Sequence, residues 1–277
     1  MPPTSVSSTK ASPAGSWPAD PPGPAPGGVC AIHQPNLFPR LSTLAKLFAA
    51  DYWIVLDDVQ FTRRDYQHRT RLAALDDPAR QQWLSLSTHL PDGRATLIHQ
   101  ARITEPERCA RRTTQLLAQH YGASPHWPDL HTRLGLVADL FTTTDRTAQI
   151  AEASTCLLLR LLGWTGTVLH SSHLDARPGR SLRLADLATT TQAGTYLCGT
   201  GGMKYLDLDL FHQRGIPVTA FRTPDTGIWT HARKISTLWA LMKHGASDLA
   251  TALRACAVDL AVSDGAAASL TSVRATL

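Results

Sequence analysis

The chain lacks the features that mark several large protein classes. Its five cysteines, Cys30, Cys109, Cys156, Cys198 and Cys256, are odd in number, widely spaced and without a C-x-x-C pair. Neither a disulfide framework nor a structural zinc site is indicated, which makes a reducing cytoplasm the expected compartment. No charged-then-apolar signal pattern opens the chain, and no apolar run approaches the roughly 20 residues of a membrane helix. We therefore expect a cytoplasmic protein without a membrane partner.

Charge and catalytic motifs are equally sparse. Lys and Arg total 27 against 22 Asp and Glu, and the excess sits in short arginine groups with no long basic tract. That distribution favours an anionic small molecule over nucleic acid as the partner. The chain has no P-loop, complete dinucleotide fingerprint or G-x-S-x-G motif. His170-x-x-His173 has no third ligand at a clear spacing, so we expect neither a metal nor a cofactor.

The chain does contain enough apolar sequence for one large core. At 277 residues, with 43% hydrophobic and 18% charged residues, it predicts a single globular domain with appendages. Residues 1–28 are rich in Pro, Ser, Gly and Ala, a composition that predicts a disordered tail. Residues 29–245 are expected to form the catalytic domain. Residues 246–277 are expected to form a C-terminal helix, over Asp248–Val258, and a flexible tail.

The first ordered segment reads as a strand, a helix and a second strand. Val29–Ile32 and Trp53–Leu56 are short apolar runs, and the amphipathic stretch Leu41–Ala50 lies between them. This βαβ pattern is typical of a parallel sheet. Further strands are expected at Trp83–Ser87, Thr96–Ile103, Thr167–Leu169, Thr195–Cys198 and Val218–Phe221. Further helices are expected at Pro106–Tyr121, Leu130–Phe141, Ser181–Thr190, Leu208–Arg214 and Ile235–Lys243, with another capped at Thr144-Asp145 and ending at Leu162.

These elements predict a three-layer α/β domain with a mostly parallel sheet and helices on both faces, Rossmann-like or nucleotidylyltransferase-like. In such sheets ligands bind beyond the carboxyl ends of the strands. The residues that leave those ends are His33, Gln34 and Asn36 after the first strand, and Asp57 and Asp58 after the second. If the two strands are neighbours in the sheet, both sets face one crevice.

The Asp57-Asp58 pair is the main candidate for catalysis. A carboxylate at a strand end can take a proton from an amine or hydroxyl, bind an ammonium group or hold a metal. It can also simply cap the next segment, in which case its neighbour is solvated. His33 and His68 are candidate acid–base groups, although a single histidine more often has a structural hydrogen bond. The structural alternative stays open for all four residues.

An anion-binding cluster follows the acid pair. Arg63, Arg64 and Arg69 are expected to hold a carboxylate, phosphate or sulfate, since guanidinium groups bind such anions through two hydrogen bonds. The alternative for some of these arginines, and for nearby Arg71, is a solvated basic face. The Gly199-Thr-Gly-Gly202 turn is a second candidate anion site, although an ordinary strand-to-helix turn explains it equally well. The substrate-binding candidates besides the arginines are Gln34, Asn36, Gln60, Tyr66, Ser171, Ser172, Gly199, Gly201 and Tyr205.

Several segments, taken together, resemble the WbqC-like protein family. They are, in order, Ile32–Pro39, Leu56–Arg64 with Tyr66, His68, Arg69 and Arg71, Ser171–Leu174, Tyr196–Tyr205 and Ile235–Trp239. The resemblance spans residues 29–245 and implies a bacterial cytosolic protein of surface-polysaccharide or specialised-metabolite biosynthesis. The chain departs from the family at His68, where Asn is more frequent, and at Tyr66 and Arg40, where Trp is frequent.

We therefore predict a biosynthetic enzyme, of transferase or of lyase or cyclase type, that acts on an amine-bearing anionic small molecule. Asp57 or Asp58 would deprotonate the nucleophile with help from His33 or His68. The arginines would hold the anionic group, which can be the leaving group. Transfer onto nitrogen and an intramolecular displacement that closes a nitrogen ring fit equally well.

Other functions and assemblies also remain open. The alternatives to this enzyme are a non-catalytic partner subunit or ligand-binding module that supports a second biosynthetic enzyme, and a nucleotidyl transferase. A homodimer or a complex with a partner biosynthetic protein is also compatible with the sequence.

Overall fold

The structure is a computed structural model that describes residues 25–274, of which residues 258–274 by their backbone alone. The expected disordered tail over residues 1–28 lies outside this range except for residues 25–28. That last part is held to the domain, because Gly27 N donates to the Gln192 oxygen and Gly194 N donates to the Gly28 oxygen, each at 2.9 Å. The described chain is therefore attached to the domain before its first strand begins.

Five parallel strands form the central sheet, in the order β7-β2-β1-β8-β9. β1 and β2 are adjacent and parallel in the sheet, which confirms the expected βαβ unit. The strand order reverses between β1 and β8, because the chain first builds the sheet on one side of β1 and then returns to its other side. The predicted α/β fold with a parallel sheet is thus confirmed. The strands are β1 (Val29–His33), β2 (Tyr52–Val55), β7 (Thr167–His170), β8 (Thr195–Gly199) and β9 (Val218–Phe221).

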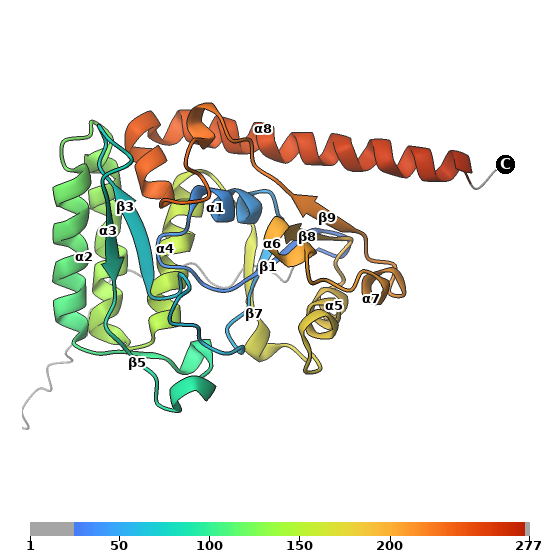
Figure 1. Cartoon of the computed structure of the whole chain (residues 1–277), viewed down its shortest axis with the longest axis horizontal. Helices are drawn as coiled ribbons and strands as arrows, with labels where there is room; N and C mark the ends of the chain where they lie inside the picture. The colour runs from blue at the N-terminus through green and yellow to red at the C-terminus, as the bar shows by residue number, and fades with distance from the viewer. Residues whose placement is uncertain (1–24, 275–277) are drawn as a thin grey trace, which may run out of the picture.

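Residues along each strand alternate between two hydrophobic clusters, as the two-residue period of a strand requires. In β2, Trp53 and Val55 belong to one cluster, and Tyr52 and Ile54 belong to the other. Figure 1 shows the helices of the first cluster along one side of the sheet and those of the second on the other, which gives the three layers. The first set includes α1 (Leu41–Phe48), α4 (Thr147–Leu161) and the start of α8 (Thr237–Arg274), and the second includes α5 (Arg180–Thr190) and α7 (Asp209–His212).

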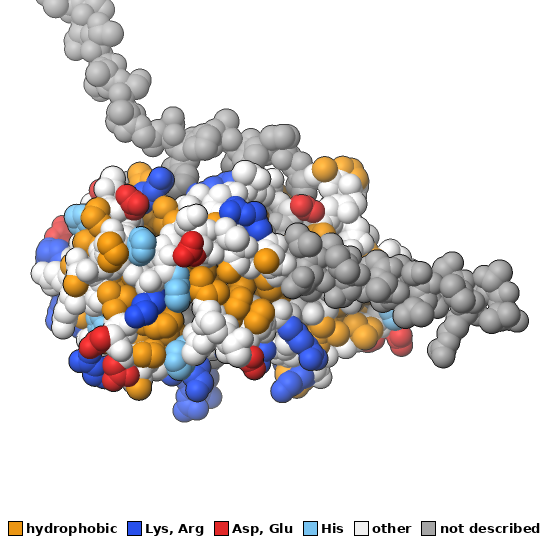
Figure 2. Space-filling model, turned by 90° about the horizontal axis from the view of Figure 1, so that it is seen from above, with side chains coloured by type: hydrophobic (Ala, Val, Ile, Leu, Met, Phe, Trp, Pro, Cys, Tyr) orange, Lys and Arg blue, Asp and Glu red, His pale blue; other side chains and the backbone are white. Residues whose placement is uncertain are grey.

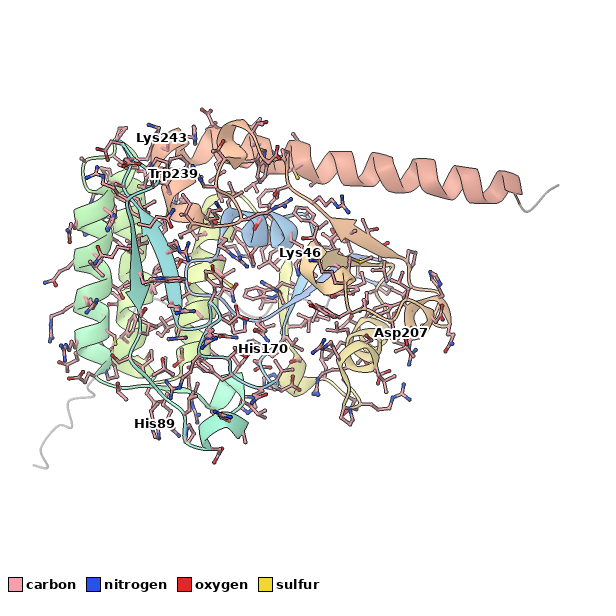
Figure 3. All side chains as sticks on the ribbon, viewed as in Figure 1. Lys46, His89, His170, Asp207, Trp239 and Lys243 are labelled. Carbon is pink, nitrogen blue, oxygen red and sulfur yellow. The ribbon has the colours of Figure 1, made fainter. Side chains whose placement is uncertain are left out.

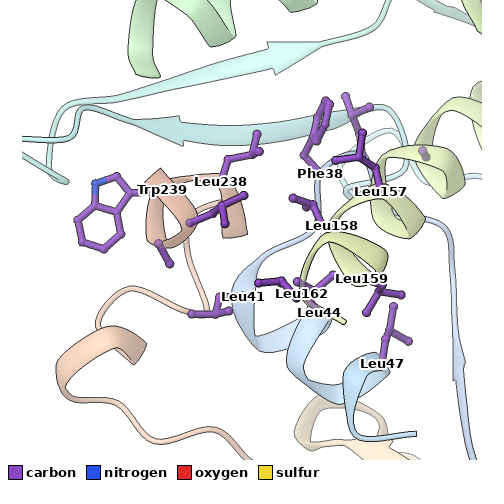
Figure 4. Close-up of a cluster of buried hydrophobic side chains, with 14 of the residues drawn as sticks. Phe38, Leu41, Leu44, Leu47, Leu157, Leu158, Leu159, Leu162, Leu238 and Trp239 are labelled. Atoms are coloured by element: carbon purple, nitrogen blue, oxygen red, sulfur yellow. The ribbon is translucent and has the colours of Figure 1, made fainter. Parts of the chain in front are cut away.

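Leucine side chains fill the space between α1 and α4. Outside these helices lie α2 (Pro106–Tyr121) and α3 (Trp127–Thr143). The long helix α8 bends at Gly245, and its second half extends away from the body of the molecule (Figure 1). No helix within residues 25–274 has both the length and the hydropathy that a membrane span requires. Figure 4 shows the leucines that α1, α4 and the residue after α4 contribute to the first cluster, which are Leu41, Leu44, Leu47, Leu157, Leu158, Leu159 and Leu162.

Between β2 and α2 the chain forms two small antiparallel pairs outside the central sheet. β3 (Arg69–Ala73) pairs with β4 (Gln81–Ser85), and β5 (Thr88–His89) pairs with β6 (Arg102–Ile103). β3 has no counterpart among the strands expected from the sequence. Its partner β4 begins and ends slightly before the expected strand Trp83–Ser87.

The expected strand Thr96–Ile103 is wrong for most of its length. Only Arg102–Ile103 is extended and paired, and a 3₁₀ turn over Ile98–Gln100 precedes it. The side chain of Gln100 accepts a hydrogen bond from Leu97 N at 2.8 Å, which stabilises the turn against an extended chain. A local side-chain contact therefore overrides the apolar pattern of this segment.

Most other element boundaries agree to within a few residues. α2 and β9 coincide with the expected ranges. α7 is shorter than the expected helix Leu208–Arg214. The helix expected over Asp248–Val258 is the second half of α8, which continues to Arg274. The Gly199–Gly202 turn itself contains a short helix, α6 (Thr200–Met203).

Candidate functional site

A cavity of about 390 Å³ opens where the strand order reverses, between the carboxyl ends of β1 and β8. Doubly wound sheets bind ligands at this point, because the segments that follow the two strands go to opposite faces and leave a crevice. The walls come from the end of β1, from α1, from the end of β8 with α6, and from the segment after β9. Among the described residues no Asp or Glu lines it, and its charged or hydrogen-bonding side chains include His33, Arg40, Ser42, Thr43, Lys46, Thr223 and Arg233.

Lys46 of α1 brings a buried ammonium group to this cavity. Its side chain is 5% exposed, and Nζ donates to the carbonyl oxygen of Ile32 at 3.0 Å. Burial lowers the pKa of Lys46 from 10.5 to about 8, and within the described range it forms no salt bridge with a carboxylate. Figure 3 places Lys46 beside α6, near the ends of β1 and β8. A buried cation without a counter-ion is costly, so this position suits an anion that no described carboxylate supplies.

Two guanidinium groups add to the positive charge. Arg40 lies over the Tyr66 ring, 4.2 Å from its centroid, and its Nη1 donates to the carbonyl oxygen of Arg233 at 3.2 Å. The buried Nε of Arg40 has no hydrogen-bond partner among the described residues, and Arg233 is exposed at the cavity. On the face seen in Figure 2, Lys and Arg side chains lie in separate groups and form no broad basic surface.

Two uncharged groups in the lining lack partners. His33 Nε2 and Thr223 Oγ1 are buried, and no described residue hydrogen-bonds to either atom. Burial, followed by the charges of Lys46 and Arg40, holds the pKa of His33 well below its usual 6.5, so the imidazole is neutral at physiological pH. Buried polar atoms in folded proteins normally have partners. Three residues that line one cavity, His33, Arg40 and Thr223, therefore each carry an unsatisfied polar atom, which is the pattern expected of a ligand site.

The Asp57-Asp58 pair lies at the end of β2, the strand next to β1. Asp57 Oδ1 accepts a hydrogen bond from Ser172 N at 3.0 Å, and Asp57 Oδ2 accepts one from Ser172 Oγ at 2.8 Å. Asp58 Oδ1 accepts from Ser171 Oγ at 2.5 Å, and Asp58 Oδ2 pairs with Arg183 of α5. We call these five residues the acid clip, because they join β2, the segment after β7 and α5. The structure brings four predicted residues together here, and their catalytic or substrate-binding roles stay a prediction.

Three predicted residues order the loop beside the cavity without lining it. Gln34 Oε1 accepts a hydrogen bond from Gln67 Nε2 at 2.7 Å. Asn36 is buried, and its carbonyl oxygen accepts from Thr155 Oγ1 at 2.9 Å. The ring of Tyr66 supports the Arg40 guanidinium from the loop before β3. Their contacts fix the path of the chain between β1 and α1, which positions Arg40.

The predicted arginine cluster does not line the cavity. Arg69 stacks on the Trp83 ring at 4.5 Å from its centroid, and its Nε donates to the Asp65 carbonyl oxygen at 3.1 Å. Arg63 and Arg64 are exposed. The cations that surround the cavity are therefore different from those that the sequence singled out.

Other predicted residues divide between the cavity and the surface. Gly199 and Gly201 line the cavity. His68 lies against Phe61, and burial, followed by Arg69 and Arg63, lowers its pKa to about 4. Gln60 is exposed and donates to the Arg94 carbonyl oxygen, and Tyr205 is 67% exposed.

The histidines after β7 have a local partner. His170 Nε2 lies 2.8 Å from Glu152 Oε2, and its ring centroid is 5.4 Å from that of His173. Within the described part of the chain, no group of three or more His, Cys, Asp or Glu side chains is arranged to hold a metal ion.

Sequence reasoning missed Lys46, Arg40, Thr223 and Arg233. An amphipathic helix normally turns its polar face to solvent. In α1 that face carries Ser42, Thr43 and Lys46, and all three line the cavity instead. One signal in the sequence could have identified Lys46. The polar face of this helix is narrow, it carries a single charge, and the helix lies between two buried strands.

Comparison with known proteins agrees with the motif pattern. The model of the WbqC-like protein family matches residues 34–247, more than half of the chain. The chain is also 23% identical over 193 residues to "Uncharacterized protein Rv1507c" from Mycobacterium tuberculosis (strain ATCC 25618 / H37Rv), a match that covers 69% of this chain and 80% of that protein. No solved structure matches it. The chain belongs to the WbqC-like protein family.

Proposed function

We propose that this protein is a biosynthetic enzyme that acts on a small molecule carrying both an amine and an anionic group. Its reaction is a group transfer onto nitrogen, or an intramolecular displacement that expels an anionic leaving group and closes a nitrogen ring. The observation that carries the proposal is Lys46, a buried cation at the cavity without a carboxylate partner in the described range.

Physical chemistry supports a bound anion as the reason for this lysine. Removing an ammonium group from water costs several kcal/mol unless an opposite charge or several hydrogen bonds replace the lost solvation. Lys46 has one carbonyl oxygen as its hydrogen-bond acceptor. Groups with strongly perturbed pKa values in a cleft are concentrated at functional sites. A ligand anion between Lys46 and Arg40 supplies the missing charge.

The amine end of the substrate is then directed along the carboxyl edge of the sheet. β2 adjoins β1, and neighbouring strands lie about 4.8 Å apart, so the acid clip begins close to the cavity wall. His33 belongs to the cavity lining and its Nε2 has no partner among the described residues, although the burial and cations that lower its pKa also make it a weak base. Either His33 or an acid-clip carboxylate serves as the base in this proposal.

Complementation of a deletion strain tests this function. Metabolite profiling of the deletion strain is expected to show loss of one product and accumulation of an amine-bearing anionic precursor. The wild-type gene restores the product, and Lys46→Met does not, because the anion loses its buried counter-ion. Lys243→Met is the matched control, since Lys243 is an exposed lysine on α8 (Figure 3).

Two outcomes of that experiment contradict the proposal. Full restoration by Lys46→Met, Asp57→Asn and Asp58→Asn alike supports a non-catalytic partner subunit. A precursor without an anionic group removes the reason for the cationic cavity.

A further inference from the structure

The cavity between β1 and β8 carries more positive charge than one carboxylate neutralises. Lys46, Arg40 and Arg233 contribute three cations, and no Asp or Glu among the described residues lines the same space. A carboxylate or a sulfate ester brings a single negative charge. A phosphate monoester brings between about 1.5 and 2 negative charges at neutral pH. Charge balance therefore favours the phosphate.

Unused hydrogen-bond donors point to the same group. An ammonium group has three hydrogens, and Lys46 uses one of them on the Ile32 carbonyl oxygen. Arg40 Nε and Thr223 Oγ1 are buried without a partner among the described residues, and Thr223 as a whole is 8% exposed. The two residues come from different segments, and both line this cavity. A phosphate has three terminal oxygens to accept them, whereas a carboxylate has two.

The size of the cavity limits the rest of the ligand. Ligand sites commonly measure about 300 to 1,000 Å³, and a volume of about 390 Å³ lies near the small end. A phosphate with a short carbon skeleton fits within this volume.

We propose that the cavity binds the phosphate group of a small phosphate monoester, with Lys46, Arg40 and Thr223 as its donors and Arg233 at the opening. This inference rests on the proposed function and names the anionic group of that substrate. Lys46 and Arg40 provide the charge, and Thr223 supplies an uncharged donor whose loss weakens binding without changing the net charge.

Calorimetry and thermal unfolding with defined anions test the phosphate site. The probes are inorganic phosphate and O-phosphoserine, compared with sulfate, acetate and glutamate at constant ionic strength. Wild-type protein is expected to bind both phosphate compounds and to unfold at a higher temperature in their presence. Thr223→Val, which keeps the shape of the side chain, weakens phosphate binding about tenfold or more, the effect of one hydrogen bond to a charged group. Lys46→Met abolishes it, and Lys243→Met leaves it unchanged.

The outcomes separate this inference from the proposed function. If glutamate or acetate stabilises the protein and phosphate does not, the phosphate assignment is overturned and an anionic substrate still stands. If no anion binds, both are overturned. Phosphate binding that survives Lys46→Met and Thr223→Val but disappears in Arg64→Ala places the anion site at the arginine cluster. Unfolding curves of each unliganded variant establish that a lost response is not a lost fold.

Discussion

Lys46 is a buried ammonium group whose acceptor is a backbone carbonyl oxygen, whereas Asp57 and Asp58 are acids with several donors each. The acid pair and Lys46 therefore differ in what their charges do for the fold. The acids contribute to holding β2, the segment after β7 and α5 together. The lysine costs stability in the unliganded protein, because one carbonyl oxygen replaces only part of the solvation that its charge has in water.

The pH dependence of stability follows from the lowered pKa of Lys46. Below pH 8 the buried amine is charged in the folded chain, which is unfavourable, and between pH 8 and 10.5 the unfolded chain keeps a proton that the folded chain has lost. The penalty is therefore present below pH 8 and fades as the pH rises toward 10.5. Lys46→Met should stabilise the unliganded protein at pH 7 by up to about 3 kcal/mol, taking about 1.4 kcal/mol per pKa unit.

Denaturant unfolding of wild type and Lys46→Met at a series of pH values measures this difference. The gain should shrink steadily above pH 8, and comparing the two proteins cancels the titration of other groups. A variant that is less stable than wild type at pH 7, or a difference that does not change with pH, contradicts the assignment of Lys46 as an uncompensated charge.

At the scale of elements, the acid clip joins segments that are far apart in the sequence. Asp58 follows β2, Ser171 follows β7 and Arg183 lies on α5. The side chains of Asp58 and Arg183 are 13% and 21% exposed, so the pair is little screened by solvent. Removing one partner of such a pair leaves the charge of the other partner largely buried and unpaired, which destabilises the fold.

Asp58→Asn should therefore destabilise the fold by about 2 kcal/mol, the range for hydrogen bonds to charged groups. The control is Asp76→Asn, because the Asp76–Arg80 pair is exposed and its loss should change stability little. Thermal and denaturant unfolding measure both variants. If Asp58→Asn is as stable as wild type while product formation in the complemented strain is lost, Asp58 acts in catalysis and the structural account of the clip fails.

The arginine cluster shows why this part of the site was not predictable from the sequence. Arg69 opens β3, and its guanidinium packs on Trp83 of β4. Four closely spaced arginines read locally as an anion clamp. The pairing of β3 with β4 decides which arginine packs on an aromatic ring and which is exposed to solvent. The spacing of the arginines along the sequence does not reveal that pairing.

At the scale of the whole molecule, Gly245 sets the direction in which the C-terminal half of α8 leaves the domain. Its φ is +83°, and a β-carbon there would lie 2.7 Å from His126 Cε1. Positive φ is accessible to glycine and strained for other residues. Both the positive φ and the nearby His126 side chain therefore require glycine at this bend.

Gly245→Ala is expected to lower stability by about 2 kcal/mol through backbone strain and the contact with His126. Adding His126→Ala should recover part of the loss, because the contact disappears and the strain remains. Gly135→Ala in α3 is the matched control, since a β-carbon there meets nothing within 4 Å and alanine favours the helix by up to about 1 kcal/mol. Equal stability of wild type and Gly245→Ala would contradict this role of the bend.

The sequence by itself determined the α/β class, the positions of most helices and strands, the family and the edge of the sheet at which the cavity opens. Those features depend on local periodicity, on turn residues and on the rule that parallel strands present their carboxyl ends together. The prediction that His33, Gly199 and Gly201 lie at this edge needed nothing more.

Only the tertiary structure decided which strands meet and which charges are left without partners. β1 lies beside β8, which comes more than a hundred residues later in the chain. The cavity forms at the ends of these two strands, and the polar face of α1 lines it. Whether a charged side chain is compensated depends on neighbours brought together by such long-range contacts. For that reason the acids that stood out in the sequence are engaged with the protein, and Lys46, which did not stand out, is the buried charge without a carboxylate partner in the described range.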